Sequence, residues 1–93
     1  MLFPVKRLMI ENTGYKRDIS LKTIYINSSS VISITDYDGV TEFLLRENSN
    51  LQDKSFSLIR LNNITDDIIV LGSAQQIFSI VKEATDGRQL LND

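Results

Sequence analysis

The order of apolar and polar residues divides the chain into a long region of strand-like segments and a short closing region with a helical repeat. Segments rich in Ile, Val, Thr and Tyr, bounded by Asn, Ser, Asp or Gly, are typical of short β-strands. The segment 68–71 is apolar at every position, so we expect it to be central or covered. Six such segments occur: 5–10, 19–27, 31–37, 40–46, 55–61 and 68–71.

Two glycines mark expected turns between these segments. Asp38-Gly39 favours a type I′ turn, which needs positive φ at both central residues. We therefore expect residues 31–37 and 40–46 to pair as a hairpin. Gly14 closes a turn after the first segment, and the polar stretch 47–54 is expected to form an exposed loop.

The closing region predicts one amphipathic helix over about 73–85. Ser73 and Gln76 have the spacing of a reciprocal capping box. Gly87 is a candidate C-terminal stop, and residues 88–93 are then a tail. On its own in water, a helix of this length would be only marginally stable, so its apolar side is expected to dock on the sheet. That side has helical spacing: Ala74, Ile77, Phe78, Val81 and Ala84.

The predicted architecture is therefore a single domain over residues 1–93 of the α+β class, mainly antiparallel β. About six short strands within residues 5–71 form a curled sheet or a partly open barrel. One C-terminal amphipathic helix caps this sheet.

Composition narrows the possible chemistry. The chain has no cysteine and no histidine, so thiolate nucleophiles, Cys-based metal sites and the usual general base near neutral pH are all excluded. A serine activated by lysine is the nucleophilic alternative that this composition leaves open. No glycine-rich phosphate loop is present. We therefore expect no catalytic residues, no metal site, no cofactor and no enzymatic activity.

The start of the chain lacks a basic segment followed by a long apolar run, so it does not resemble a signal peptide. No apolar stretch approaches the roughly 20 residues that span a bilayer. We expect a cytoplasmic protein with no membrane partner.

Charge is distributed unevenly along the chain. The net charge is −2, yet residues 1–22 carry a net charge of +3. An exposed basic surface with a neighbouring aromatic residue, here Tyr15, is one pattern of nucleic-acid binding. The acidic balance of the whole chain opposes this interpretation, which remains the alternative. The candidate nucleic-acid patch is Lys6, Arg7, Lys16, Arg17 and Lys22.

Protein partners are the first expectation. Short strands leave sheet edges that self-association can cover. The helix is also apolar over more than one narrow stripe, which favours contact with a second copy and a homo-oligomer. The candidate self-association face is Ile77, Phe78, Ile80 and Val81.

About half of the chain resembles the FlbD-like family of small flagellar regulatory proteins. The similarity lies in Tyr25-Ile26-Asn27, in Val31-Ile32-Ser33-Ile34, and in the run from Ile69 to Val81, with an insertion between residues 37 and 67. The resemblance implies a non-enzymatic regulator and assigns no functional residues. Strands followed by a C-terminal helix also look like a pleckstrin-homology-like barrel, by topology alone. Frequent Ile, Asn, Ser and Asp are compatible with a small phage or bacterial accessory protein.

Overall fold

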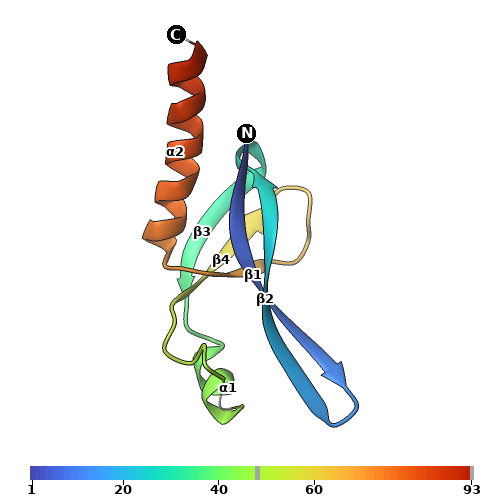
Figure 1. Ribbon diagram of the computed structural model, residues 1–93. Coiled ribbons are helices and arrows are strands. Elements are labelled where there is room, and N and C mark those ends of the chain that lie inside the picture. Colours follow the sequence, from blue (N-terminus) through green and yellow to red (C-terminus); the bar gives the residue numbers. More distant parts are fainter. Residues whose placement is uncertain (48, 93) are drawn as a thin grey trace.

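One antiparallel sheet and a long C-terminal helix define the fold in the computed structural model (Figure 1). The structure describes residues 1–47 and 49–92, and for residues 85–92 it describes only the course of the helix. The strands are β1 (Leu2–Thr13), β2 (Lys16–Asn27), β3 (Val31–Tyr37), β4 (Phe56–Leu61) and β5 (Ile68–Leu71). The helices are the 3₁₀ turn η1 (Ser28–Ser30), α1 (Thr41–Arg46) and α2 (Ala74–Asn92).

The strand order in the sheet is β2-β1-β5-β4-β3, and every neighbouring pair is antiparallel. The expected α+β class is confirmed, with five strands instead of about six. The sheet is not closed, which fits the expected curled sheet or partly open barrel. The strand that the sequence predicted to be central or covered, β5, lies in the middle of the order. The two edges of the sheet are therefore β2 and β3.

The sheet separates two hydrophobic clusters because successive residues of a strand point to opposite faces. On β5, Ile68 and Val70 join the cluster beneath α2, whereas Ile69 and Leu71 pack against the cluster beneath α1. Ile77 of α2 has an exposed fraction of only 2% and completes the first cluster. The apolar side of the closing helix thus docks on the sheet through Ile77, Val81 and Ala84, whereas Phe78, expected on the same side, is exposed.

The start of α2 has the predicted capping box. The backbone N–H of Ser73 donates to Gln76 Oε1 at 2.8 Å, and the backbone N–H of Gln76 donates to Ser73 Oγ at 3.2 Å. The helix does not stop near Gly87 but continues to Asn92, because a glycine inside a helix costs only about 1 kcal/mol relative to alanine. It therefore includes residues 88–92, where a tail was expected; Asp93 lies outside the described residues.

The expected hairpin between residues 31–37 and 40–46 is wrong. Residues 41–46 form helix α1, and β3 pairs with β4 instead. Val40, Phe43 and Leu44 follow the spacing of one helix face, and these side chains pack in the cluster beneath α1. Gly39 is not among the glycines with positive φ; a Cβ there would meet the ring and hydroxyl of Tyr37. A glycine at this position is explained by the close approach of Tyr37 and not by a positive φ.

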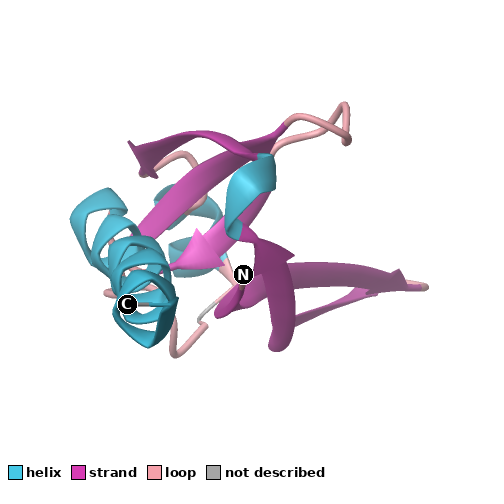
Figure 2. Cartoon of the chain, turned by 90° about the horizontal axis from the view of Figure 1, so that it is seen from above, coloured by secondary structure: helices cyan, strands magenta, loops and turns pink. Residues whose placement is uncertain are grey.

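The hairpin of β1 and β2 is longer than predicted, with 12 residues in each strand. Its tip is Gly14-Tyr15, where Gly14 has the expected positive φ, 69°. Within the described chain, β1 pairs with β5 only at Arg7 opposite Val70. The part beyond this pair, residues 7–22, projects away from α2 in both views and is called the hairpin arm below (Figures 1 and 2).

Candidate functional site

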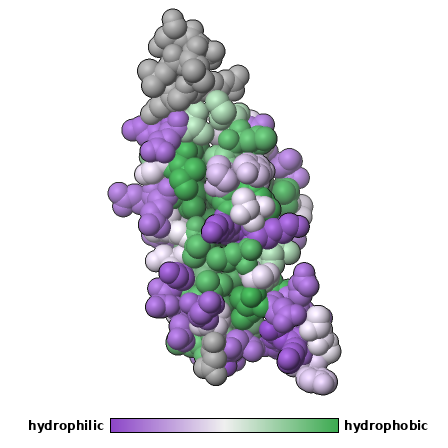
Figure 3. All heavy atoms as spheres, viewed as in Figure 1, coloured by the Kyte–Doolittle hydropathy of each residue, from purple (hydrophilic) through white to green (hydrophobic). Residues whose placement is uncertain are grey.

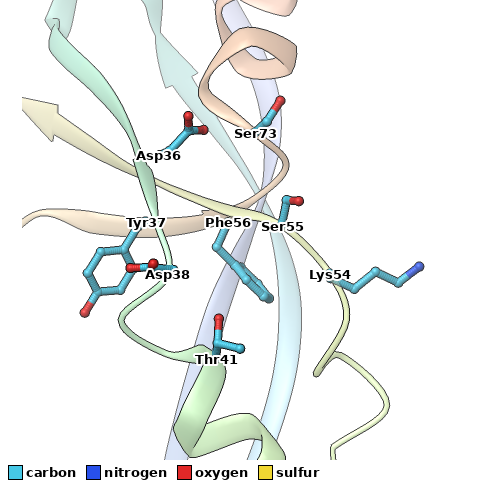
Figure 4. A pocket seen from close by; sticks show the side chains of 8 residues that line it. All are labelled: Asp36, Tyr37, Asp38, Thr41, Lys54, Ser55, Phe56 and Ser73. Atoms are coloured by element: carbon cyan, nitrogen blue, oxygen red, sulfur yellow. The ribbon is translucent and has the colours of Figure 1, made fainter.

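A polar hollow of about 490 Å³ lies where β3, β4, α1 and the start of α2 meet (Figure 4). Asp36 and Ser73 lie on the side of the hollow nearest α2, while Lys54 points away from both acidic side chains. The eight residues that line it are Asp36, Tyr37, Asp38, Thr41, Lys54, Ser55, Phe56 and Ser73.

Two polar side chains of this hollow, Asp36 and Ser73, cap the N-terminus of α2. The backbone N–H of Ala74 donates to Asp36 Oδ1 at 2.8 Å, and Ser73 Oγ accepts from Gln76. A carboxylate at the N-terminus of α2 opposes the binding of an anion there, although helix N-termini otherwise attract anions. Within the described residues, no group of three or more acidic side chains could hold a metal ion. This hollow is therefore best explained as the joint between sheet and helix.

An apolar groove runs between β3 and the flank of α2 and encloses about 490 Å³. None of the described residues that line this groove is charged. It is called the β3–α2 groove below. Its apolar lining comes from Val31, Ile32, Ile34, Ala74, Phe78 and Val81. Its polar lining comes from the uncharged residues Ser28, Ser33 and Gln75.

Two large apolar side chains stand out of this groove on opposite walls. Ile32 on β3 is 60% exposed and Phe78 on α2 is 59% exposed. A β-bulge between Val31 and Ser33 shifts the register of β3 against β4 at this point. Bulges can re-aim a side chain. Here the irregularity accompanies an exposed isoleucine on the α2 side of the edge strand.

The predicted self-association face is divided by the structure. Ile77 is buried in the core, so its inclusion in an interface is wrong. Val81 is half-buried against the same cluster. Phe78 and Ile80 remain exposed, but on different flanks of α2: Phe78 borders the β3–α2 groove, and Ile80 borders a smaller hollow of about 270 Å³ beside β1. Figure 3 shows apolar side chains gathered in a band down this view of the molecule.

The five basic residues of the candidate nucleic-acid patch do not all come together. Arg7 and Lys22 are directly opposite each other, whereas Lys6 is opposite Thr23 and so lies on the other face of the hairpin. Lys16 and Arg17 lie at the far end of the arm.

Arg17 at the far end is also engaged within the chain. Its Nη1 is 3.2 Å from Glu47 Oε1, and its guanidinium carbon is 5.6 Å from the centre of the Phe43 ring. The basic N-terminal region is thus split into two groups, one at each end of the arm, and Arg17 braces the arm against the segment of α1.

Ile32 is the residue of the groove that sequence reasoning missed. The sequence placed it only within a strand, residues 31–37, that was expected to pair with residues 40–46. The missing information was the pairing of β3, because an edge strand leaves such a residue uncovered. No pattern in the sequence states which strand is the edge.

Comparison with known proteins finds no matching protein family, curated protein or solved structure. The resemblance to the FlbD-like family therefore stays a sequence-based prediction. Among the described helices, none combines the length and the apolar character that crossing a membrane requires.

Proposed function

We propose that this chain is a non-catalytic assembly module that associates with a second copy of itself through the β3–α2 groove. One observation carries the proposal: Ile32 and Phe78, each about 60% exposed, flank an uncharged groove at the edge of the sheet. Exposed apolar surface next to a strand edge is typical of protein-interaction sites.

A second copy suits this surface because the same patch contains both protruding and receiving elements. In a two-fold pair each copy presents the same residues, so Ile32 and Phe78 of one copy can enter the groove of the other. Strand β3 carries a single charged residue, Asp36, and neither lysine nor proline blocks its edge.

The ends of the groove are complementary in charge. Asp36 contacts Ala74 at the end where α2 begins. Lys82 follows Phe78 by four residues, so it lies one turn further along the same flank of α2. Figure 1 shows α2 running back along β3 toward the start of that strand. A two-fold antiparallel arrangement brings Asp36 of one copy toward Lys82 of the other.

The test replaces the two protruding side chains separately, as Phe78→Asp and Ile32→Asp, and measures mass against concentration by analytical ultracentrifugation. Both positions are largely exposed, so the fold is expected to survive and circular dichroism checks it. We expect a concentration-dependent oligomer for the natural sequence and at least about tenfold weaker association for each variant, because an unpaired carboxylate would be desolvated in the interface.

The matched control is Ile64→Asp, since Ile64 is 47% exposed in the connection between β4 and β5 and does not line the groove. Association should be unchanged in this control. A natural chain that stays monomeric up to about millimolar concentration, or a Phe78→Asp variant that associates normally, would overturn the proposal.

A further inference from the structure

One face of the hairpin arm carries two rows of charge of opposite sign. Arg7 lies directly opposite Lys22, and Glu11 lies directly opposite Asp18. Between these two pairs lies the pair of Met9 and Ser20. This set of residues is called the striped face below.

The two rows share a face because each is separated from the next by an even number of residues along both strands. Four residues of extended strand place the rows about 13 Å apart. The opposite face of the arm is apolar: Leu8, Ile19 and Leu21 pack in the cluster beneath α1. Glu11, Asp18 and Lys22 are exposed and Arg7 is half-buried, so the striped face is available to a partner.

Each row places like charges across from one another, and such pairs destabilise an antiparallel hairpin. Within the described residues, neither row forms an ion pair, whereas Arg17 and Arg60 both have acidic partners. Among the described residues, the charges of these two rows have no ion-pair partner, and the order of the rows, positive then negative, is self-complementary. Lys16, opposite Thr13, lies beyond both rows at the tip of the same face.

We propose that a second copy packs its arm against this face, antiparallel and about a two-fold axis near Met9. Each Arg7–Lys22 row then faces the Glu11–Asp18 row of the other copy, so both like-charge pairs are neutralised. An isologous contact requires this reciprocity. The inference rests on the proposed function only in naming a second copy as the partner. The arm and the groove are separate surfaces, so together they build assemblies larger than a dimer.

The test is a charge swap in the full chain. The first variant, Glu11→Lys with Asp18→Lys, makes the face wholly basic; the second, Arg7→Glu with Lys22→Glu, makes it wholly acidic. In each double variant, the two changed residues lie opposite each other and again carry charges of the same sign. The repulsion between these two residues therefore matches that in the natural chain. Because Arg7 is half-buried, Lys22→Glu alone is measured should the double variant fail to fold. This single change places a carboxylate opposite Arg7, so it tests the loss of association and does not preserve the like-charge row.

To remove the groove contact, all of these changes are also placed in the Phe78→Asp chain, and association is measured by sedimentation equilibrium at low salt. We expect the natural arm to associate, each swapped variant alone to associate at least tenfold more weakly, and the equimolar mixture of basic and acidic variants to regain association. Raising the ionic strength to about 0.5 M should weaken the regained contact, because exposed charges are screened.

The results separate the two interfaces. A mixture that does not associate, or swapped variants that associate like the natural arm, overturns the arm contact. Complete loss of association in Phe78→Asp alone also overturns it and leaves the groove as the interface. Association that follows the charge swaps but ignores Phe78→Asp overturns the groove and retains the arm.

Discussion

The two edges of the sheet are built differently. Strand β2 carries Lys16, Arg17, Asp18 and Lys22 within its first seven residues, and these residues belong to the hairpin arm, which extends beyond the rest of the sheet (Figure 2). Strand β3 carries one charged residue, Asp36, whose carboxylate is already bonded to the N–H of Ala74. Charged side chains on an edge strand oppose its pairing with a strand of another chain, whereas an edge strand with few charges stays open to such pairing.

In the proposed assembly, this difference directs association to two separate surfaces. The β2 side offers charges that select a partner by sign, whereas the β3 side offers apolar side chains and a groove whose wall is α2. The bulge in β3 limits its regular edge to residues 33–37, which favours contact through side chains over simple extension of the sheet. Each side can therefore be tested by changes that leave the other intact.

The largest effect is expected at Ile77, which packs α2, one wall of the β3–α2 groove, against the sheet. Ile77→Asp places a carboxylate where the side chain is 2% exposed among Phe3, Ile59 and Val70. We expect the free energy of unfolding to fall by about 4 kcal/mol or more, from lost packing and an unpaired buried charge. Urea denaturation measures this change. Such a loss removes the groove along with the fold.

The matched control lies three residues further along the same helix. Ile80 is 36% exposed, so Ile80→Asp should change the free energy of unfolding by no more than about 1 kcal/mol. Equal destabilisation by the two changes would show that the docked side of α2 has been wrongly assigned.

A medium effect is expected where β3 and α2 join. Ser73→Ala and Asp36→Ala each remove one acceptor from the N-terminus of α2, at 3.2 and 2.8 Å from their donors. Each should destabilise the domain by about 1 kcal/mol. Asp38→Ala is the control, since that side chain lines the same hollow without a hydrogen bond to the described chain. If Asp38→Ala is as costly as the other two in urea denaturation, capping does not explain the loss.

The elements with a strong local signal were predictable from the sequence. The start of α2 follows from the spacing of Ser73 and Gln76 together with the helical repeat, and both hydrogen bonds of the capping box are present. The central position of β5 follows from its unbroken apolar run, because only a strand covered on both faces tolerates one.

The pairing of distant segments was not predictable in the same way. Asp38-Gly39 has the composition of a hairpin turn, yet the helical spacing of Val40 and Leu44 and their burial beneath the sheet outweigh it. The groove depends on which strand forms the edge, and the striped face depends on the register of β1 with β2. Both are properties of long-range pairing that no single segment encodes.

The smallest effect on stability is expected from the contacts that hold the hairpin arm against the segment of α1. Arg17 joins the arm to the segment of α1 through Glu47 and the Phe43 ring. The Arg17 and Glu47 side chains are 53% and 32% exposed, so solvent screening limits their ion pair, and Arg17→Ala should cost the whole domain less than about 1 kcal/mol. The local effect should be clearer, because a two-stranded hairpin on its own is marginal in water. Amide hydrogen exchange in the arm, residues 7–22, should accelerate severalfold in Arg17→Ala while β4 and β5 keep their protection.

Lys16→Ala, one position away and without an ion pair among the described residues, should leave exchange in the arm unchanged. If both variants leave the arm equally protected, then its packing on the cluster beneath α1 alone holds it, and the charges of β2 act only toward partners.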